Sequence, residues 1–141
     1  MQKVEHIGIA VKDLELSVPL FEKLLATVCY KTETVQSESV ITAFFRTGDT
    51  KLELVQSLDA DGVIGKYIER RGEGLHHLAF EVADIYSEME RLKNEGFVLL
   101  SDQPKPGADN KLVCFLHPRG TNGVLVELVM ERKSGNDPAS E

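Results

Sequence analysis

Hydrophobic and polar residues follow the same pattern in two stretches of the chain that lie 71 residues apart. Each stretch opens with a histidine, His6 or His77, continues with alternating apolar residues over the length of a strand, and closes with an aspartate before a helical pattern. A second match pairs Glu53 with Glu127 at a spacing of 74 residues, which places three extra residues in the turn before the last strand of the second copy. The chain is therefore predicted to contain two copies of one unit.

Within each copy, the periodicity predicts one strand, one helix and three further strands, a β-α-β-β-β unit. The first helix is expected to begin at Ser17, because this start leaves Pro19 in the first turn. It would turn three apolar residues inward: Phe21, Leu24 and Leu25. The second helix is expected to follow Asp84 as its N-cap and to end at Gly96, with three apolar residues on its inward face: Ile85, Met89 and Leu92. The expected strands cover residues 4–11, 29–33, 39–46 and 51–56, then 75–82, 98–101, 112–117 and 124–130.

These elements predict one domain over residues 1–131, with repeat one at about 4–57, a linker helix at about 61–72 and repeat two at about 74–130. The tail at 132–141 is expected to be disordered because it is polar. One unit alone would cover only one face of its sheet with a helix. The predicted fold class is therefore α+β, with the two repeats forming a curved, barrel-like mixed sheet around an open cup, a natural place for a ligand.

Strand side chains alternate between the two faces of a sheet, and this alternation assigns one histidine and one glutamate of each copy to the cup. The four residues are His6, Glu53, His77 and Glu127, with small neighbours such as Gly8 that leave room beside them. A lone strand histidine is more often a structural core residue. Two matched pairs of histidine and glutamate instead favour a divalent metal ion such as Co, Ni, Zn or Mn, with positions left for water or substrate.

Other residues with chemical potential have simpler interpretations. His76 is expected to point towards the core or the barrel edge, and His117 to be either a turn residue or a ligand-contacting one. Cys29 and Cys114 have no nearby base and are predicted to be small core residues. Three basic residues in the loops of the second copy are either solvated or in contact with substrate phosphates: Lys105, Lys111 and Arg119.

The composition excludes several functions. The 141 residues include 16 Lys and Arg against 23 Asp and Glu, a net charge of −7 that argues against binding to nucleic acid or to an anionic membrane. Two cysteines without close partners predict no disulfide framework, and no apolar run reaches the length of a membrane span. A cytoplasmic protein is expected, in which a bound cation would supply the positive centre that an acidic substrate needs.

The duplicated unit with its two His/Glu pairs resembles the vicinal oxygen chelate superfamily, which includes glyoxalase I and the extradiol dioxygenases. The resemblance extends from about residue 4 to residue 130, and the stretches 5–11, 74–82, 115–118 and 123–128 are most similar to the methylmalonyl-CoA epimerases. It implies that His6, His77 and Glu127 bind the metal. Glu53 falls where epimerases carry Gln or Glu and glyoxalases carry Glu.

This resemblance implies a metal-dependent isomerase that epimerises methylmalonyl-CoA by removing and returning the proton next to the thioester, through a metal-stabilised enediolate. Glu127 is the expected first base and Glu53 the second. Some epimerases carry a glutamate on the strand before that of Glu53, where Thr42 stands in our alignment, and threonine cannot serve as that base. The alternatives are a glyoxalase I-type lactoylglutathione lyase and a non-catalytic small-molecule binder. An acyl-CoA substrate is the expected partner, and a homodimer is expected because such sheets present exposed edges.

Overall fold

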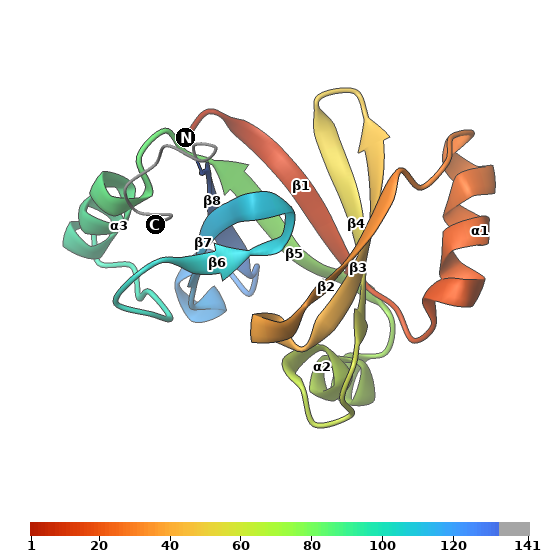
Figure 1. Cartoon of the computed structure of the whole chain (residues 1–141). Helices are drawn as coiled ribbons and strands as arrows, with labels where there is room; N and C mark the ends of the chain where they lie inside the picture. Colours follow the sequence, from red (N-terminus) through yellow and green to blue (C-terminus); the bar gives the residue numbers. More distant parts are fainter. Residues whose placement is uncertain (133–141) are drawn as a thin grey trace.

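The computed structural model describes residues 1–132 and contains, within them, one eight-stranded mixed sheet and three α-helices (Figure 1). Its strands are β1 (Lys3–Ala10), β2 (Lys31–Val35), β3 (Val40–Thr47), β4 (Thr50–Ser57), β5 (Gly74–Glu81), β6 (Lys105–Gly107), β7 (Lys111–Leu116) and β8 (Val126–Glu131). Their order across the sheet is β2-β3-β4-β1-β5-β8-β7-β6. The α+β class with two β-α-β-β-β repeats is confirmed. The predicted disordered tail lies, apart from residue 132, outside the described residues.

The two repeats meet at the centre of the sheet, where β1 and β5 pair in antiparallel orientation. β1 also pairs in parallel with β4, which puts Gly8 opposite Glu53, and β5 pairs in parallel with β8, which puts Ala79 opposite Glu127. The first and last strands of each repeat therefore lie side by side in the middle of the sheet. This topology brings residues that are far apart in the sequence to one place.

Helix α1 (Leu14–Leu25) begins three residues before Ser17, so the predicted start was wrong. Asp13 sets the start, because its side chain accepts a hydrogen bond of 2.9 Å from the backbone N–H of Glu15 and caps the helix. Pro19 consequently lies inside the helix and not in its first turn. Since proline has no N–H, the carbonyl of Glu15 lacks its usual donor four residues later.

The inward face of α1 also differs from the prediction at one position. Phe21 and Leu25 pack against the sheet as predicted, but Leu24 is 69% exposed and Val18 packs inward. The earlier start explains the difference, because Leu14 is buried and an inward face repeats at spacings of three and four residues from there.

The other two helices follow the sequence prediction more closely. Helix α3 (Ile85–Asn94) is capped by Asp84, whose side chain accepts from the backbone N–H groups of Tyr86 and Ser87, and its buried residues are Ile85, Met89 and Leu92. Helix α2 (Val63–Arg71) joins the repeats and packs Ile64 against a cluster that includes Val55. Figure 1 shows α1 and α3 at opposite ends of the curved sheet. In the described part of the chain, no helix is long and apolar enough to cross a membrane.

The strand expected at residues 98–101 was wrong. Only Leu99 pairs there, in an isolated bridge to Leu116, and the edge strand of the second repeat is β6 around Pro106. The apolar residues at 98–101 suggested a strand, but Val98 and Leu100 are both exposed. An edge strand is the place where a sheet tolerates a proline, which has no N–H to donate.

Candidate metal centre

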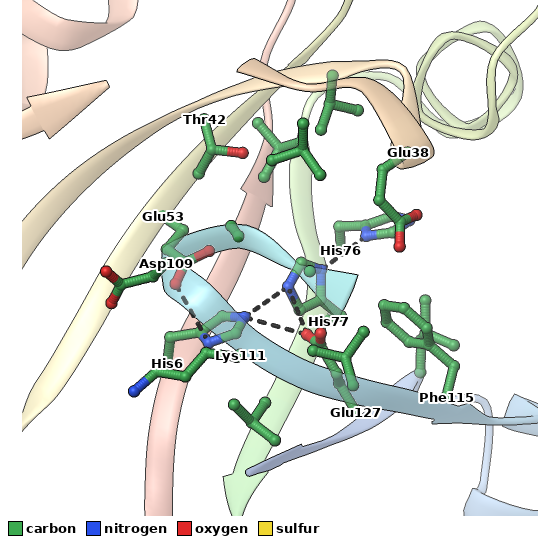
Figure 2. Close-up of a pocket in the computed structure, with 18 of the residues that line it drawn as sticks. His6, Glu38, Thr42, Glu53, His76, His77, Asp109, Lys111, Phe115 and Glu127 are labelled. Carbon is green, nitrogen blue, oxygen red and sulfur yellow. Dashed lines mark hydrogen bonds and ion pairs between the residues drawn. The ribbon is translucent and has the colours of Figure 1, made fainter. Parts of the chain in front are cut away.

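Three of the four predicted ligands converge at the centre of the sheet (Figure 2). They come from β1, β5 and β8, and they are His6, His77 and Glu127. The two Nε2 atoms of the histidines are 3.0 Å apart. Oε1 of Glu127 lies 3.1 Å from Nε2 of His6 and 3.3 Å from Nε2 of His77. The repeat therefore places ligand atoms from both copies within reach of a single ion.

The fourth predicted ligand, Glu53 on β4, lies on the other side of His6. Its Oε2 atom is 3.2 Å from Nδ1 of His6 and not beside Nε2, so it forms a second cluster with His6 and Glu5. Figure 2 shows Glu53 approaching the imidazole from the side away from Glu127. A role for Glu53 as a metal ligand requires another side-chain rotamer.

Two β-bulges between β1 and β5 make more side chains face this centre than strict alternation predicts. Glu5 is an extra residue on β1 between the pairs of Val4 and His6, and His76 is an extra residue on β5 between the pairs of Leu75 and His77. A bulge puts two residues of one strand opposite one residue of its partner and redirects their side chains. Sequence analysis overlooked Glu5 for this reason, since a residue next to His6 would face away in a regular strand.

His76 likewise does not occupy the predicted position at the core or barrel edge. Its Nδ1 atom lies 2.9 Å from Nδ1 of His77, and its ring makes an edge contact with Tyr67, with ring centroids 4.8 Å apart. Burial lowers the pKa of His76 to about 4. A neutral His76 is therefore available to accept a hydrogen bond from the Nδ1–H of His77, which leaves Nε2 of His77 free to bind.

Buried carboxylates concentrate negative charge at the centre. Three buried carboxylates, those of Glu5, Glu53 and Glu127, surround His6. Burial alone would lower the pKa of His6, but Glu53, Glu127 and Glu5 outweigh it and raise the pKa to about 10. Burial, with the nearby carboxylates of Glu127 and Glu5, raises the pKa of Glu53 to about 7. Without an ion, a proton on His6 supplies the positive charge.

The arrangement fits a divalent cation on two further grounds. Oε1 of Glu127 is buried and has no hydrogen-bond partner within residues 1–132, although two imidazole nitrogens lie near it. Ligand atoms held at about 2.1 Å from one ion are about 2.9–3.4 Å apart in octahedral or tetrahedral geometry, and the distances among His6, His77 and Glu127 fall in this range. Gly8 completes the fit, because a Cβ there would come within 2.0 Å of the His77 ring.

The centre lies at the wall of a cavity of about 230 Å³. Most of the remaining wall is apolar, with Val35, Val40, Val55, Ile64, Val113 and Phe115 among its members. Thr42 also lines the cavity, and its hydroxyl cannot serve as the proton-transfer base that a glutamate carboxylate would provide. Lys105 and Lys111 line the cavity as well, whereas Arg119 does not.

A further carboxylate, Glu38, faces the cavity and was missed by the sequence analysis. It belongs to a short 3₁₀ turn, η1 (Gln36–Glu38), between β2 and β3, where the two-residue period of a strand does not apply. Burial raises its pKa, Lys105 opposes this rise, and Glu127 adds to it. The one available signal was a glutamate four residues before Thr42, which stands where some epimerases carry a glutamate.

The remaining candidates from the sequence have structural places. Nδ1 of His117 accepts a hydrogen bond of 3.0 Å from the backbone N–H of Arg119, which makes His117 a turn residue. Cys114 is fully buried in the core of the second repeat, and Cys29 packs against the core of the first. The interpretation of both cysteines as core residues is confirmed.

Comparison with known proteins decides the family. A family model described as the Glyoxalase/Bleomycin resistance protein/Dioxygenase superfamily matches residues 5–115. The chain belongs to this superfamily. Among its relatives, the ethylmalonyl-CoA/methylmalonyl-CoA epimerase of Cereibacter sphaeroides is 37% identical over 128 residues, which cover 89% of this chain and 96% of that protein. The mitochondrial methylmalonyl-CoA epimerase of Homo sapiens is 34% identical over 127 residues, which cover 89% of this chain and 72% of that protein.

A solved structure within the superfamily agrees with these relatives. A variant of Streptomyces coelicolor methylmalonyl-CoA epimerase, in complex with 2-nitronate-propionyl-CoA, superposes with a TM-score of 0.88 at 31% identity and covers 94% of this chain and 99% of that chain. The predicted resemblance to methylmalonyl-CoA epimerases is thereby confirmed, and this superfamily member is an enzyme of the isomerase class.

Proposed function

We propose that the protein epimerises methylmalonyl-CoA, or a close α-alkylmalonyl-CoA ester, at the carbon next to the thioester. The observation that carries this proposal is the convergence of two imidazole nitrogens and one carboxylate oxygen within 3.3 Å of one another at the wall of an apolar cavity. Similarity to epimerases of 2-alkylmalonyl-CoA esters supports the substrate class. A solved relative that holds a CoA ester supports an acyl-CoA ligand.

His6, His77 and Glu127 would hold a divalent ion, with Glu53 as a fourth ligand after a change of rotamer. The chemistry that such an ion supplies is Lewis-acid stabilisation of the negative charge on two substrate oxygens. The cavity walls exclude water from the carbon that loses its proton, because valine, isoleucine and phenylalanine side chains line them. The positive centre that the acidic chain lacks would thus come with the ion, which is Co, Ni, Zn or Mn.

Epimerisation needs one base to take the proton and an acid on the opposite face to return one. Glu127 is the proposed first base, because its carboxylate reaches the centre. Glu53 is the second base that the sequence analysis assigned, and in the ion-free chain burial raises its pKa to about 7. Glu38 is the rival for this role, because it faces the cavity from η1 without contacting either site histidine through an ion pair.

The test is the entry of solvent deuterium at C2 of methylmalonyl-CoA with the metal-loaded protein. The proposal expects exchange by the wild-type chain, and at least 100-fold slower exchange by Glu127→Gln. Metal content is measured in both, because Glu127 would also bind the ion. Glu131→Gln, on the exposed end of the same strand, is the matched control and should exchange at the wild-type rate. No exchange by metal-loaded wild type would contradict the proposed function.

The two candidates for the second base are separated by metal content. Glu53→Gln is expected to lower metal affinity and activity together, whereas Glu38→Gln is expected to keep the metal. A Glu38→Gln variant that keeps its metal but loses epimerisation would assign the second base to Glu38. Unchanged epimerisation in that variant would leave the role with Glu53.

A glyoxalase I-type activity is the alternative, because glyoxalases share the Glu at the position of Glu53. Turnover of methylglyoxal with glutathione, together with no exchange on the CoA ester, would select it. Binding of either compound without turnover would select a non-catalytic binder. The homodimer and the cytoplasmic location remain predictions, which sedimentation and cell fractionation would check.

A further inference from the structure

We propose that Glu5, Lys51 and Asp109 form a positioning chain that orients His6 for metal binding and links this orientation to the seam between the two edges of the sheet. The inference rests on the proposed metal centre, but it concerns residues that do not themselves contact the ion in that proposal. One hydrogen-bonded network would then hold the two edges of the sheet together and set the affinity of the centre for its ion.

The first link joins Glu5 to His6. Oε1 of Glu5 lies 2.5 Å from Nδ1 of His6, and both side chains are almost fully buried. An Nδ1–H that donates to this carboxylate leaves the lone pair of Nε2 directed at His77 and Glu127. Glu53 also approaches Nδ1, but from 3.2 Å. The shorter contact assigns the orienting role to Glu5 and leaves Glu53 available to the ion.

The second link is Lys51, which is 8% exposed and lies between two carboxylates. Its Nζ atom is 2.6 Å from Oε2 of Glu5 and 2.6 Å from Oδ2 of Asp109. A buried ammonium with two close carboxylates has its charge compensated, and it fixes the position of each of them. Lys51 therefore prevents the Glu5 carboxylate from rotating away from His6.

The third link is Asp109 in the 3₁₀ turn η2 (Ala108–Asn110), which follows edge strand β6. Its backbone is in the left-handed region, with φ of 59°, where aspartate is one of the few tolerated residues other than glycine. From there its N–H donates to Oε1 of Glu33 over 2.9 Å, and its Oδ1 accepts from Nζ of Lys31 over 2.7 Å. Both partners belong to β2, the other edge of the sheet. Asp109 thus joins the sheet edges and, through Lys51, the ligand His6.

Lys51→Met tests this chain, because methionine keeps the apolar stem of the lysine side chain and lacks its charged ammonium. The measurement is the apparent Kd for Co²⁺, obtained by competition with a chromophoric chelator. Loss of a group that orients a metal ligand typically weakens binding about 10- to 100-fold; we expect this range for Lys51→Met and for Glu5→Gln. Lys3→Met is the matched control: it removes an exposed lysine of β1 whose Nζ donates only to the Asp49 carbonyl, outside the chain of Glu5, Lys51 and Asp109, and its Kd should stay within about twofold of the wild type.

A second readout separates orientation from general stability. In ion-free protein, the imidazole ¹⁵N shifts of His6 should change in Lys51→Met and not in Lys3→Met. If Lys51→Met does not fold, Asp109→Asn replaces it, because Asp109 is partly exposed and its removal opens no core cavity. A Lys51→Met or Asp109→Asn variant with wild-type Co²⁺ affinity and unchanged His6 shifts would overturn the inference.

Failure of the proposed function would give a different result. In that case the wild-type chain would bind no Co²⁺ or would not catalyse exchange, while the ¹⁵N shifts of His6 would still respond to Lys51→Met if the positioning chain is correct. If the wild type binds Co²⁺ and is active, but the His6 shifts are the same in Lys51→Met as in the wild type, the positioning chain alone is refuted.

Discussion

Glu5 and His76 occupy equivalent positions in the two repeats: each is the extra residue of a β-bulge and directly precedes a histidine of the centre. Each also meets Nδ1 of that histidine, at 2.5 Å for Glu5 and His6 and at 2.9 Å for His76 and His77. The duplication has therefore kept the geometry and changed the chemistry. His6 contacts a carboxylate, which favours positive charge on its imidazole, whereas His77 contacts a neutral ring.

The first prediction concerns His76. His76→Phe keeps a ring against Tyr67 but removes the acceptor for the Nδ1–H of His77. We expect Co²⁺ binding to weaken about 10-fold, because His77 loses its orienting partner. Tyr67→Phe is the control: it removes only the hydroxyl that donates to the Leu75 carbonyl and should leave the affinity unchanged. Equal affinities of His76→Phe and the wild type would show that packing alone orients His77.

A second prediction concerns Gly8, which faces the His77 ring across the central strand pair. A Cβ at this position would lie 2.0 Å from Cε1 of His77, so Gly8→Ala must displace the ring. We expect at least a 10-fold loss of Co²⁺ affinity, with the far-ultraviolet circular dichroism spectrum unchanged. Gly120→Ala is the matched control, since the nearest atom to its Cβ would be 3.9 Å away. Wild-type affinity in Gly8→Ala would contradict the placement of His77.

The third prediction concerns the two faces of helix α1. Val18→Ala removes two methyl groups from the core of the first repeat and should lower the free energy of unfolding by about 1–2 kcal/mol. Leu24→Ala, on the exposed face, should change it by less than about 0.5 kcal/mol. Urea unfolding measures both. A larger loss of stability in Leu24→Ala than in Val18→Ala would instead support the inward face predicted from the sequence, which contained Leu24.

The residues that were predictable from the sequence are those whose strand keeps its two-residue period on at least one side, since each bulge precedes its histidine and the alternation is regular after it. His6, His77 and Glu127 were found because alternation and duplication agree, and the structure places their ligand atoms together. Glu5 and His76 escaped because a bulge adds a residue, and the pattern of one strand does not show what its partner strand does. The sequence alone does not reveal a bulge, since it depends on the register of two strands about 70 residues apart.

Local competition explains the errors in the elements. At α1, the rule that proline avoids helix interiors opposed the capping preference of Asp13, and the cap prevailed. At residues 98–101, an apolar run suggested a strand, but β7 pairs there only through Leu99. Glu38 and Asp109 lie in 3₁₀ turns, where no periodic pattern assigns a direction to a side chain. Their positions follow from the closure of the sheet, which is a tertiary property.

The last prediction is the pH dependence of metal binding. In the ion-free chain, His6 has a pKa near 10 and carries a proton throughout the range from pH 6 to 8. This proton must leave when Nε2 binds an ion, so each pH unit should raise the affinity about 10-fold. Glu53 has a pKa near 7, and below that pH it is protonated as well. If Glu53 is the fourth ligand, it releases a second proton there.

A plot of log affinity against pH should therefore have a slope near 2 at pH 6 and a slope near 1 at pH 8. Glu53→Gln removes the second titrating group, and its slope should stay near 1 across the whole range. Chelator competition at several pH values measures the slope, and calorimetry in buffers of different ionisation enthalpy counts the released protons independently. A wild-type slope of 1 at pH 6 would remove Glu53 from the metal ligands. It would leave the ion to His6, His77 and Glu127, the three side chains that already share one point.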